Sequence, residues 1–375
     1  MYLVGMPESS ERPPWVPDDA EGVFATTVMR GVEQPERRAA RPSQMRRMPS
    51  VDELVEGIRG GDLALISRAI TLVESNAPAH RPAAREVLQR IGGNPGFSRR
   101  VGISGVPGAG KSTFIEALGN YLCDQGHRVA VLAVDPSSSL TGGSILGDKT
   151  RMETLCRRED CFIRPSPSGG ALGGVARKTR ETIAICEAAG FDIVLVETVG
   201  VGQSEIAVRA MVDCFLLVLI AGAGDELQGM KKGIFEIADI LMVNKADGEN
   251  RIRAEATRQN FERVIHYLSS ATEGWEPPVL TVSSMERRGI DELWNKVGEY
   301  FDHVQAKGIF EERRKSQALA WWQSLVEQEL RVRFLSNPSV AAFSRKLESD
   351  ILAGRTAPSL AAEELLALFS LNPSA

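Results

Sequence analysis

The sequence lacks an apolar run long enough to cross a bilayer, has few histidines and cysteines, and has no excess of positive charge. Its longest strongly apolar run, around Phe215–Ala223, has the length of a buried strand. Five scattered cysteines without a CxxC pair favour reduced thiols over a disulfide framework or a zinc finger. A net charge of −5 excludes a global basic field for binding nucleic acid. We therefore expect a cytoplasmic protein that binds neither membranes nor nucleic acid.

The remaining composition is that of a globular protein, except at the N-terminus. The 375 residues are 43% hydrophobic, which is enough for a substantial core. The first fifty residues instead hold seven of the nineteen prolines, seven arginines against seven acids, and no apolar periodicity. This predicts a disordered tail over residues 1–47, without the apolar core of a secretion signal or the composition of a transit peptide. An arginine-rich docking arm, a solvated tail and a start placed upstream of Met48 all stay open.

Helical periodicity begins immediately after this tail. Val51, Leu54, Val55 and Ile58 have helical spacing, and Gly60-Gly61 ends that helix. Asp62 is predicted to cap a second helix through Val73, and a third covers Ala83–Ile91. Residues 48–97 are therefore predicted to form an N-terminal helical segment.

Short runs rich in valine, isoleucine and leucine alternate with helical stretches over residues 98–307. The runs are continuous rather than alternating, as in strands that are covered on both faces. They predict a doubly wound, mostly parallel α/β sheet, in which ligands bind beyond the carboxyl ends of the strands. The expected strands are Val101–Ser104, Val129–Val134, Asp192–Glu197, Phe215–Ile220, Ile240–Val243 and Val279–Val282.

The pattern of strands ends near Gly308, and residues 308–375 read as a helical arm. Three helices are expected over Arg313–Leu335, Val340–Leu352 and Ser359–Leu368. The first carries a wide apolar stripe that includes Trp321 and Trp322. Packing onto the sheet domain and burial against a second subunit are both open interpretations of this stripe.

A glycine-rich loop between the first strand and the next helix fits the pattern GxxxxGK[ST]. Its glycines let backbone N–H groups approach phosphate oxygens, and the helix N-terminus favours an anion. Lys111 can place its charge on the β- and γ-phosphates, and Ser112 can offer its hydroxyl to Mg²⁺. The residues predicted to bind phosphates are Gly105, Val106, Pro107, Gly108, Ala109, Gly110, Lys111, Ser112 and Thr113.

A second loop, Asn244–Asp247, follows the strand Ile240–Val243 and has the pattern NKxD. The Asp247 carboxylate can accept hydrogen bonds from both N1–H and the exocyclic amine of guanine, whereas adenine offers neither donor in that arrangement. The stem of Lys245 can cover the base plane, and Asn244 can brace the loop. The residues expected to meet the guanine carbonyl through their backbone follow the next strand: Ser283, Ser284 and Met285.

Several acids are placed where a phosphate-bound cation needs oxygen ligands. Asp135 and Glu197 end strands, and Asp148 follows a glycine-rich loop. With Ser112 they are predicted to hold Mg²⁺, and the alternative for each acid singly is a helix cap or a surface charge. The Gly200 N–H is placed to sense a γ-phosphate.

The loop Gly222–Gly233 combines four glycines with charges of both signs. It reads either as a nucleotide-responsive segment that includes Lys231 or as a solvated turn. No residue is an obvious strong base, which suits phosphoryl transfer, because positioning and charge stabilisation dominate that reaction. The candidate catalytic residues are Lys111, Glu197, Gln203 and Lys231.

Four segments together closely resemble the MeaB/ArgK family, the GTPase chaperones associated with methylmalonyl-CoA mutase. The resemblance extends from about Met48 to the C-terminus. It is carried by residues 133–138 (AVDPSS), 142–152 (GGSILGDKTRM), 197–205 (ETVGVGQSE) and 224–229 (GDELQG).

This resemblance implies a homodimeric P-loop GTPase related to the metallochaperone GTPases, with a dimerisation arm over residues 308–375. Ser112, Asp135, Asp148 and Glu197 fall on positions tied to Mg²⁺ and to the first two switch regions. Lys231 falls on the third switch, which communicates with the mutase.

The resemblance also implies partners and a role. The family uses GTP binding and hydrolysis to gate the loading of adenosylcobalamin onto the mutase and to support replacement of damaged cofactor. We expect an adenosylcobalamin-dependent acyl-CoA mutase and the adenosyltransferase as partners, with no tightly bound cobalamin on this chain. Two rival functions are a nickel or cobalt metallochaperone GTPase and a P-loop kinase. The scattered histidines and isolated cysteines argue against the first, and the base-reading loop argues against the second.

Overall fold

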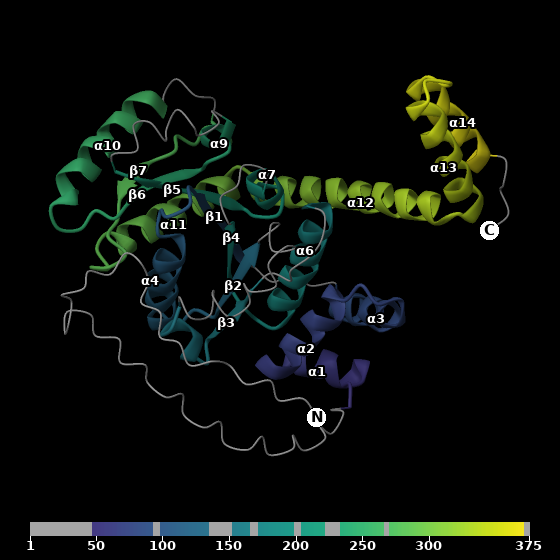
Figure 1. Cartoon of the computed structure of the whole chain (residues 1–375). Coiled ribbons are helices and arrows are strands. Elements are labelled where there is room, and N and C mark those ends of the chain that lie inside the picture. Colours follow the sequence, from purple (N-terminus) through teal and green to yellow (C-terminus); the bar gives the residue numbers. More distant parts are fainter. Residues whose placement is uncertain are drawn as a thin grey trace, which may run out of the picture. The chain divides into compact units, whose positions relative to one another are not determined.

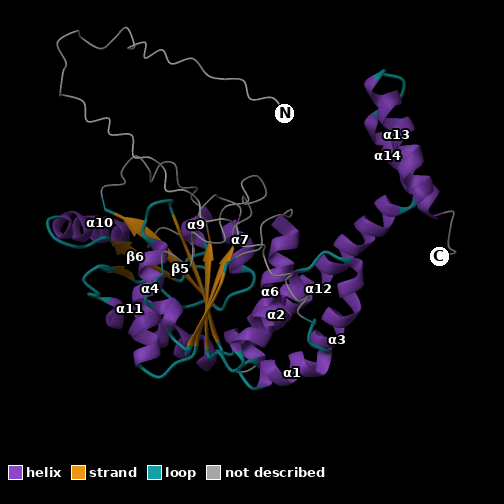
Figure 2. Cartoon of the chain, turned by 60° about the horizontal axis from the view of Figure 1, so that its bottom comes forward, coloured by secondary structure: helices purple, strands orange, loops and turns teal. Residues whose placement is uncertain are grey.

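Among the described residues, seven strands form one parallel sheet, which Figure 2 shows edge-on with its strands fanned out. Their order across the sheet is β3-β2-β4-β1-β5-β6-β7, and every neighbouring pair is parallel. All carboxyl ends therefore lie at the same edge. The strands are β1 (Arg99–Gly105), β2 (Val129–Val134), β3 (Cys161–Arg164), β4 (Ile193–Thr198), β5 (Cys214–Ile220), β6 (Ile240–Asn244) and β7 (Val279–Thr281).

The computed structural model describes residues 47–92, 98–134, 152–165, 172–198, 204–221, 233–265 and 270–370. Residues from Pro49 to the C-terminus form one compact unit. The predicted tail lies, up to residue 46, outside the described residues. Within the described ranges, no helix is both long enough and apolar enough to span a membrane.

Helices cover both faces of the sheet (Figure 1). One apolar cluster joins the sheet to α4 (Lys111–Asp124) and α11 (Ile290–Ala306). A second cluster, on the other face, includes α6 (Leu172–Ala188), α7 (Ser204–Arg209), α9 (Gly233–Glu236) and α10 (Asn250–Ile265). The predicted doubly wound α/β fold is therefore confirmed, and its continuous apolar strands are buried on both faces.

The N-terminal helices pack onto the second cluster through the apolar sides of α1 (Val51–Arg59), α2 (Leu63–Glu74) and α3 (Arg81–Ile91). A short 3₁₀ turn, η1 (Pro78–His80), precedes α3. Ser50 and Glu53 form a capping box at the start of α1, which ends at Gly60. The Asp62 carboxylate accepts hydrogen bonds from the backbone N–H groups of residues 64 and 65, as expected for the cap of α2.

The C-terminal region is helical as predicted, with α12 (Ile309–Ser336), α13 (Pro338–Leu352) and α14 (Pro358–Ser370). α12 begins four residues before the predicted start, and Figure 1 shows it as one continuous helix. Packing onto the sheet domain accounts for only part of its apolar stripe. Trp322, Val326 and Leu330 are 61%, 40% and 54% exposed.

One strand was missed by the sequence analysis. β3 is only four residues long, follows a 3₁₀ turn, η2 (Leu155–Arg157), and pairs with β2 at one end of the described sheet. Its last two residues are only partly buried, and the run contains an arginine. A strand covered less completely does not need the continuous apolar run that revealed the others.

Candidate nucleotide-binding site

The glycine-rich loop leaves the end of β1 and enters α4 at the edge where the strands end. Gly110 precedes α4 in the left-handed conformation, with a φ of 83°. A Cβ on Gly110 would lie 2.8 Å from the Asn244 side-chain nitrogen, and one on Gly105 would overlap the Val218 carbonyl group. Both positions therefore require glycine, and the loop folds closely over the neighbouring strands.

Lys111 is the first residue of α4, and its side chain turns back onto the loop. It is only 7% exposed, and its Nζ donates hydrogen bonds to the Gly105 and Val106 carbonyls at 2.8 and 3.2 Å. Burial lowers the pKa of Lys111, while the charges of Glu197 and Glu205 act in the opposite direction. The loop thus holds a buried cation beside backbone amides at a helix N-terminus, an arrangement that suits phosphate.

Ser112 and Glu197 bring the loop and β4 together. The Ser112 hydroxyl donates a hydrogen bond of 2.9 Å to Glu197 Oε1, and Glu197 is 9% exposed. Both groups supply the oxygen ligands that Mg²⁺ prefers, and they lie next to the Lys111 loop, where a nucleotide's phosphates would lie. The residues present therefore fit a phosphate-bound Mg²⁺.

Asn244 connects the phosphate loop with the base-reading loop. Its Nδ2 donates to the Ala109 carbonyl at 2.9 Å, and its Oδ1 accepts from the Ser284 hydroxyl at 2.7 Å. The buried amide at the end of β6 thus contacts residues that follow both β1 and β7. Lys245 has a positive φ of 58°, which turns the chain sharply after the strand.

The Asp247 carboxylate lies near the segment after β7. Its Oδ1 accepts a long hydrogen bond of 3.4 Å from the Ser283 hydroxyl. Ser283 and Ser284 are buried, whereas the Met285 side chain is exposed. The structure therefore brings together the predicted base-reading residues from two loops that are 36 residues apart in the chain.

Five predicted site residues lie outside the described residues, so their positions stay predictions: Asp135, Asp148, Gly200, Gln203 and Lys231. Sequence reasoning also missed a contact at this edge. The Thr198 hydroxyl donates to Ser104 Oγ at 2.8 Å, and both residues are buried at the ends of β4 and β1. The signal available was a hydroxyl residue near the carboxyl end of each of the two strands.

Comparisons with known proteins identify relatives of this chain. Residues 66–339 match the family model described as "Methylmalonyl Co-A mutase-associated GTPase MeaB". A probable GTPase of Mycobacterium tuberculosis is 51% identical over 323 residues, which cover 86% of this chain and 96% of that protein. GTPase ArgK of Escherichia coli is 45% identical over 308 residues, covering 81% and 93%.

Two further similarities extend the comparison. The mitochondrial methylmalonic aciduria type A homolog of Mus musculus is 43% identical over 330 residues, covering 85% of this chain and 79% of that protein. The crystal structure of an LAO/AO transport system kinase has a TM-score of 0.68 and 36% identity, and the match covers 85% of this chain and 97% of that one.

Proposed function

Because the chain belongs to the family of methylmalonyl-CoA mutase-associated GTPases, we propose that it uses GTP to gate the loading of adenosylcobalamin onto a methylmalonyl-CoA mutase. In this role it also protects or reactivates the mutase. The chain is a P-loop GTPase, because its relatives are named GTPases and its sheet and phosphate loop are those of that fold. The observation that carries the proposal is the Asn244 amide, which joins a phosphate loop to a carboxylate-bearing base loop.

Hydrolysis at this site depends mainly on positioning and on charge stabilisation, as in other phosphoryl transfers. Lys111 and the loop amides hold the β- and γ-phosphates, and a water molecule attacks the γ-phosphate in line. Ser112 and Glu197 would hold Mg²⁺, together with Asp135 and Asp148 from outside the described residues. When bound, the ion neutralises charge on the phosphates. For positioning or charge stabilisation, the candidates outside the described residues are Gln203 and Lys231.

Replacing Asp247 with asparagine is expected to move the preference from guanine to xanthine nucleotides. A carboxylate accepts both guanine donors, whereas an amide turns an N–H group toward the guanine amine. Xanthine has a carbonyl there instead, which can accept from that N–H. The affinity for GDP should fall about a hundredfold, and that for the xanthine nucleotide should rise. Displacement of a fluorescent GDP analogue measures both affinities.

Asp302→Asn is the matched control for this substitution, because Asp302 is exposed on α11. It should bind GDP as the wild type does. Unchanged GDP affinity in Asp247→Asn, or equal competition by ATP and GTP in the wild type, would remove Asp247 from base recognition.

The exposed side of α12 supports a homodimer. Leu319, Trp322, Val326 and Leu330 recur at helical spacing, and all four are exposed in the single chain. A second copy that covers this stripe removes its apolar area from water. The further partners in the proposal are the mutase and the adenosyltransferase, and cobalamin is not held tightly by this chain alone.

The test of this function is gel filtration with light scattering of the full chain mixed with the adenosylcobalamin-dependent mutase from the same source. We expect a complex whose mass includes two copies of this chain and whose amount differs between GDP and a non-hydrolysable GTP analogue. The free protein should migrate as a dimer in the same experiment. No complex with either nucleotide would overturn the mutase role, and a labelled acceptor formed from γ-labelled nucleotide would favour a kinase.

A further inference from the structure

The connection between α7 and β5 is held by side chains from two other helices. Gln317 of α12 donates through Nε2 to the Val212 carbonyl at 2.8 Å and to the Arg209 carbonyl at 3.4 Å. Arg180 of α6 donates to the Ala210 carbonyl at 2.6 Å and to the Gln317 carbonyl at 3.1 Å. The end of α7 is thus bound to the start of the C-terminal arm, with Arg180 bridging the two.

The opposite end of α7 lies beside the nucleotide site. Only residues 199–203 separate the end of β4, which carries Glu197, from the start of α7. Glu205, in the first turn of α7, is buried, and its charge acts on Lys111. A helix of six residues is about 9 Å long, so a displacement at one end is transmitted to the other.

The contact made by Gln317 is less completely hydrogen-bonded than the contacts that Arg313 and Arg314 make just before it on α12. We call those earlier contacts the anchor. Arg314 of that anchor forms an ion pair of 2.7 Å with the buried Asp213 carboxylate, and Arg313 donates to the Asp213 carbonyl. One and two turns further on, Gln317 Oε1 and Trp321 Nε1 are buried, and neither has a hydrogen-bond partner among the described residues. Unsatisfied buried groups cost free energy, so these two turns are the part of the docked helix that is easiest to rearrange.

Arg180, which bridges α7 and α12, lies in surroundings that disfavour its charge. Its guanidinium lies 5.8 Å from the centre of the Trp321 ring. Burial, followed by the nearby charge of Arg100, lowers the pKa of Arg180 to about 10. Among the described residues, the guanidinium contacts two carbonyl groups and this ring rather than a carboxylate, so its surroundings depend on the positions of both α7 and α12.

We infer that Gln317 and Arg180 are positioning residues for GTP hydrolysis, which make the placement of α7 at the active-site edge depend on how the C-terminal arm is docked. The inference rests on the proposed GTPase function. Coupling between two sites is reciprocal, so the nucleotide also alters the docking of α12. A partner that moves the arm would thereby change the rate of hydrolysis without touching the nucleotide.

The first test is the variant Gln317→Leu, which keeps the size of the side chain and removes its donor. We expect kcat for GTP hydrolysis to fall about tenfold, while KM for GTP stays within about twofold, because the phosphate and base loops are unaltered. kcat is normalised to nucleotide-binding sites counted with a fluorescent GDP analogue. Gln328→Leu is the matched control, since Gln328 lies about three turns further along the same side of α12 and is exposed.

Arg180→Met is the second variant, and it keeps the test informative if Gln317→Leu does not fold. It should reproduce the loss of kcat. The double variant should lose no more than the larger single loss, because the two side chains form one connection. Independent, multiplying effects would contradict a shared role.

The second test uses the wild-type chain and needs no substitution. Hydrogen exchange of the backbone over residues 313–325 should differ between GDP and a non-hydrolysable GTP analogue, and this difference should disappear in Gln317→Leu. Exchange that is the same in both nucleotides, or variants that change only the melting temperature, would overturn the inference while hydrolysis by the wild type upholds the proposed function. A wild type that hydrolyses no GTP would instead overturn that function.

Discussion

Replacing Lys111 with alanine is expected to lower kcat for GTP hydrolysis by about a thousandfold or more. The Lys111 ammonium is buried at the start of α4 and already points at the loop, where it contacts two backbone carbonyls. In the transition state it faces negative charge that is spread over the γ-phosphate oxygens. Without it, no other described lysine from this loop can supply a fixed charge there. Phosphate release under saturating GTP measures the loss.

Two further variants separate charge from packing in this prediction. Lys111→Met keeps the apolar stem, so it should be about as inactive as Lys111→Ala if the charge is what matters. Lys296→Ala removes a lysine on α11 whose ion-pair partner among the described residues is Glu299 in the same helix, and it should leave the rate unchanged. A rate in Lys111→Ala equal to that of the wild type would exclude the phosphate loop from the mechanism.

The class of fold could be predicted because most of its strands are continuous apolar runs, as expected for strands that are buried on both faces. β5, for example, reads as seven residues without a charge, and six of them are buried. Which strands are neighbours could not be predicted in the same way. β1 lies between β4 and β5, and that order depends on how the helices pack on the two faces. β3 was not predicted, because a short and partly buried strand lacks a continuous apolar run.

In the candidate site, too, local motifs could be predicted, whereas contacts between residues far apart in the chain could not. The phosphate loop could be predicted, because glycines and one lysine at fixed spacing are a local requirement of the chemistry. The bond from Asn244 to Ala109 could not, since it joins residues 135 positions apart and exists only after the sheet has formed. The contact of Gln317 with the end of α7 is equally remote in sequence, and a glutamine on a long helix gives no sign of it.

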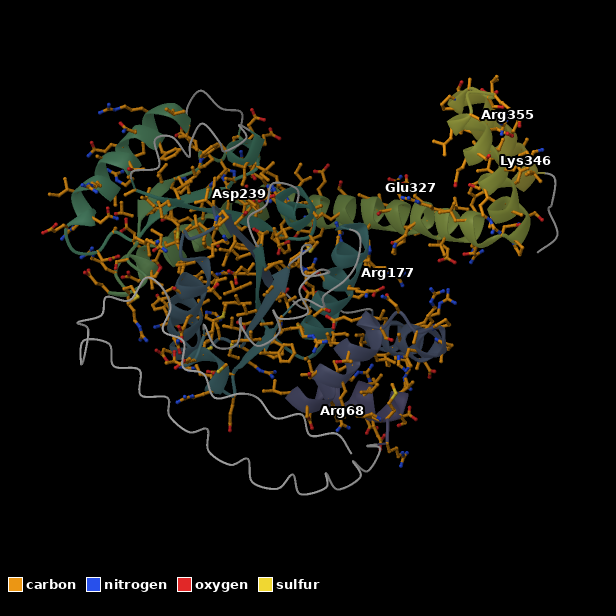
Figure 3. The ribbon with its side chains drawn as sticks, in the orientation of Figure 1. Arg68, Arg177, Asp239, Glu327, Lys346 and Arg355 are labelled. Atoms are coloured by element: carbon orange, nitrogen blue, oxygen red, sulfur yellow. The ribbon has the colours of Figure 1, made fainter. Side chains whose placement is uncertain are left out.

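Replacing Asp239 with alanine is expected to lower the free energy of unfolding by about 3–5 kcal/mol, because it leaves a buried charge without its partner. Asp239 lies in the sheet domain (Figure 3), directly before β6, and its side chain is fully buried. Its carboxylate accepts hydrogen bonds from the Arg209 guanidinium at 2.6 and 3.2 Å. The Phe215 N–H and the Thr272 hydroxyl donate to it at 2.8 and 2.6 Å. All these donors lose their acceptor at once, and the small cavity gives them no room to reach bulk water.

Urea denaturation followed by tryptophan fluorescence measures this loss, since the Trp275 Nε1 donates to the Asp239 carbonyl at 2.8 Å and reports on the same region. Asp302→Ala is the matched control, because Asp302 is exposed on α11, and its effect should stay within about 0.5 kcal/mol. Arg209 lies at the end of α7, so the loss of Asp239 should also loosen the helix that Gln317 holds. A variant nearly as stable as the wild type would mean that the Arg209 charge finds another acceptor, and Asp239 would then not be what fixes the α7–β5 connection.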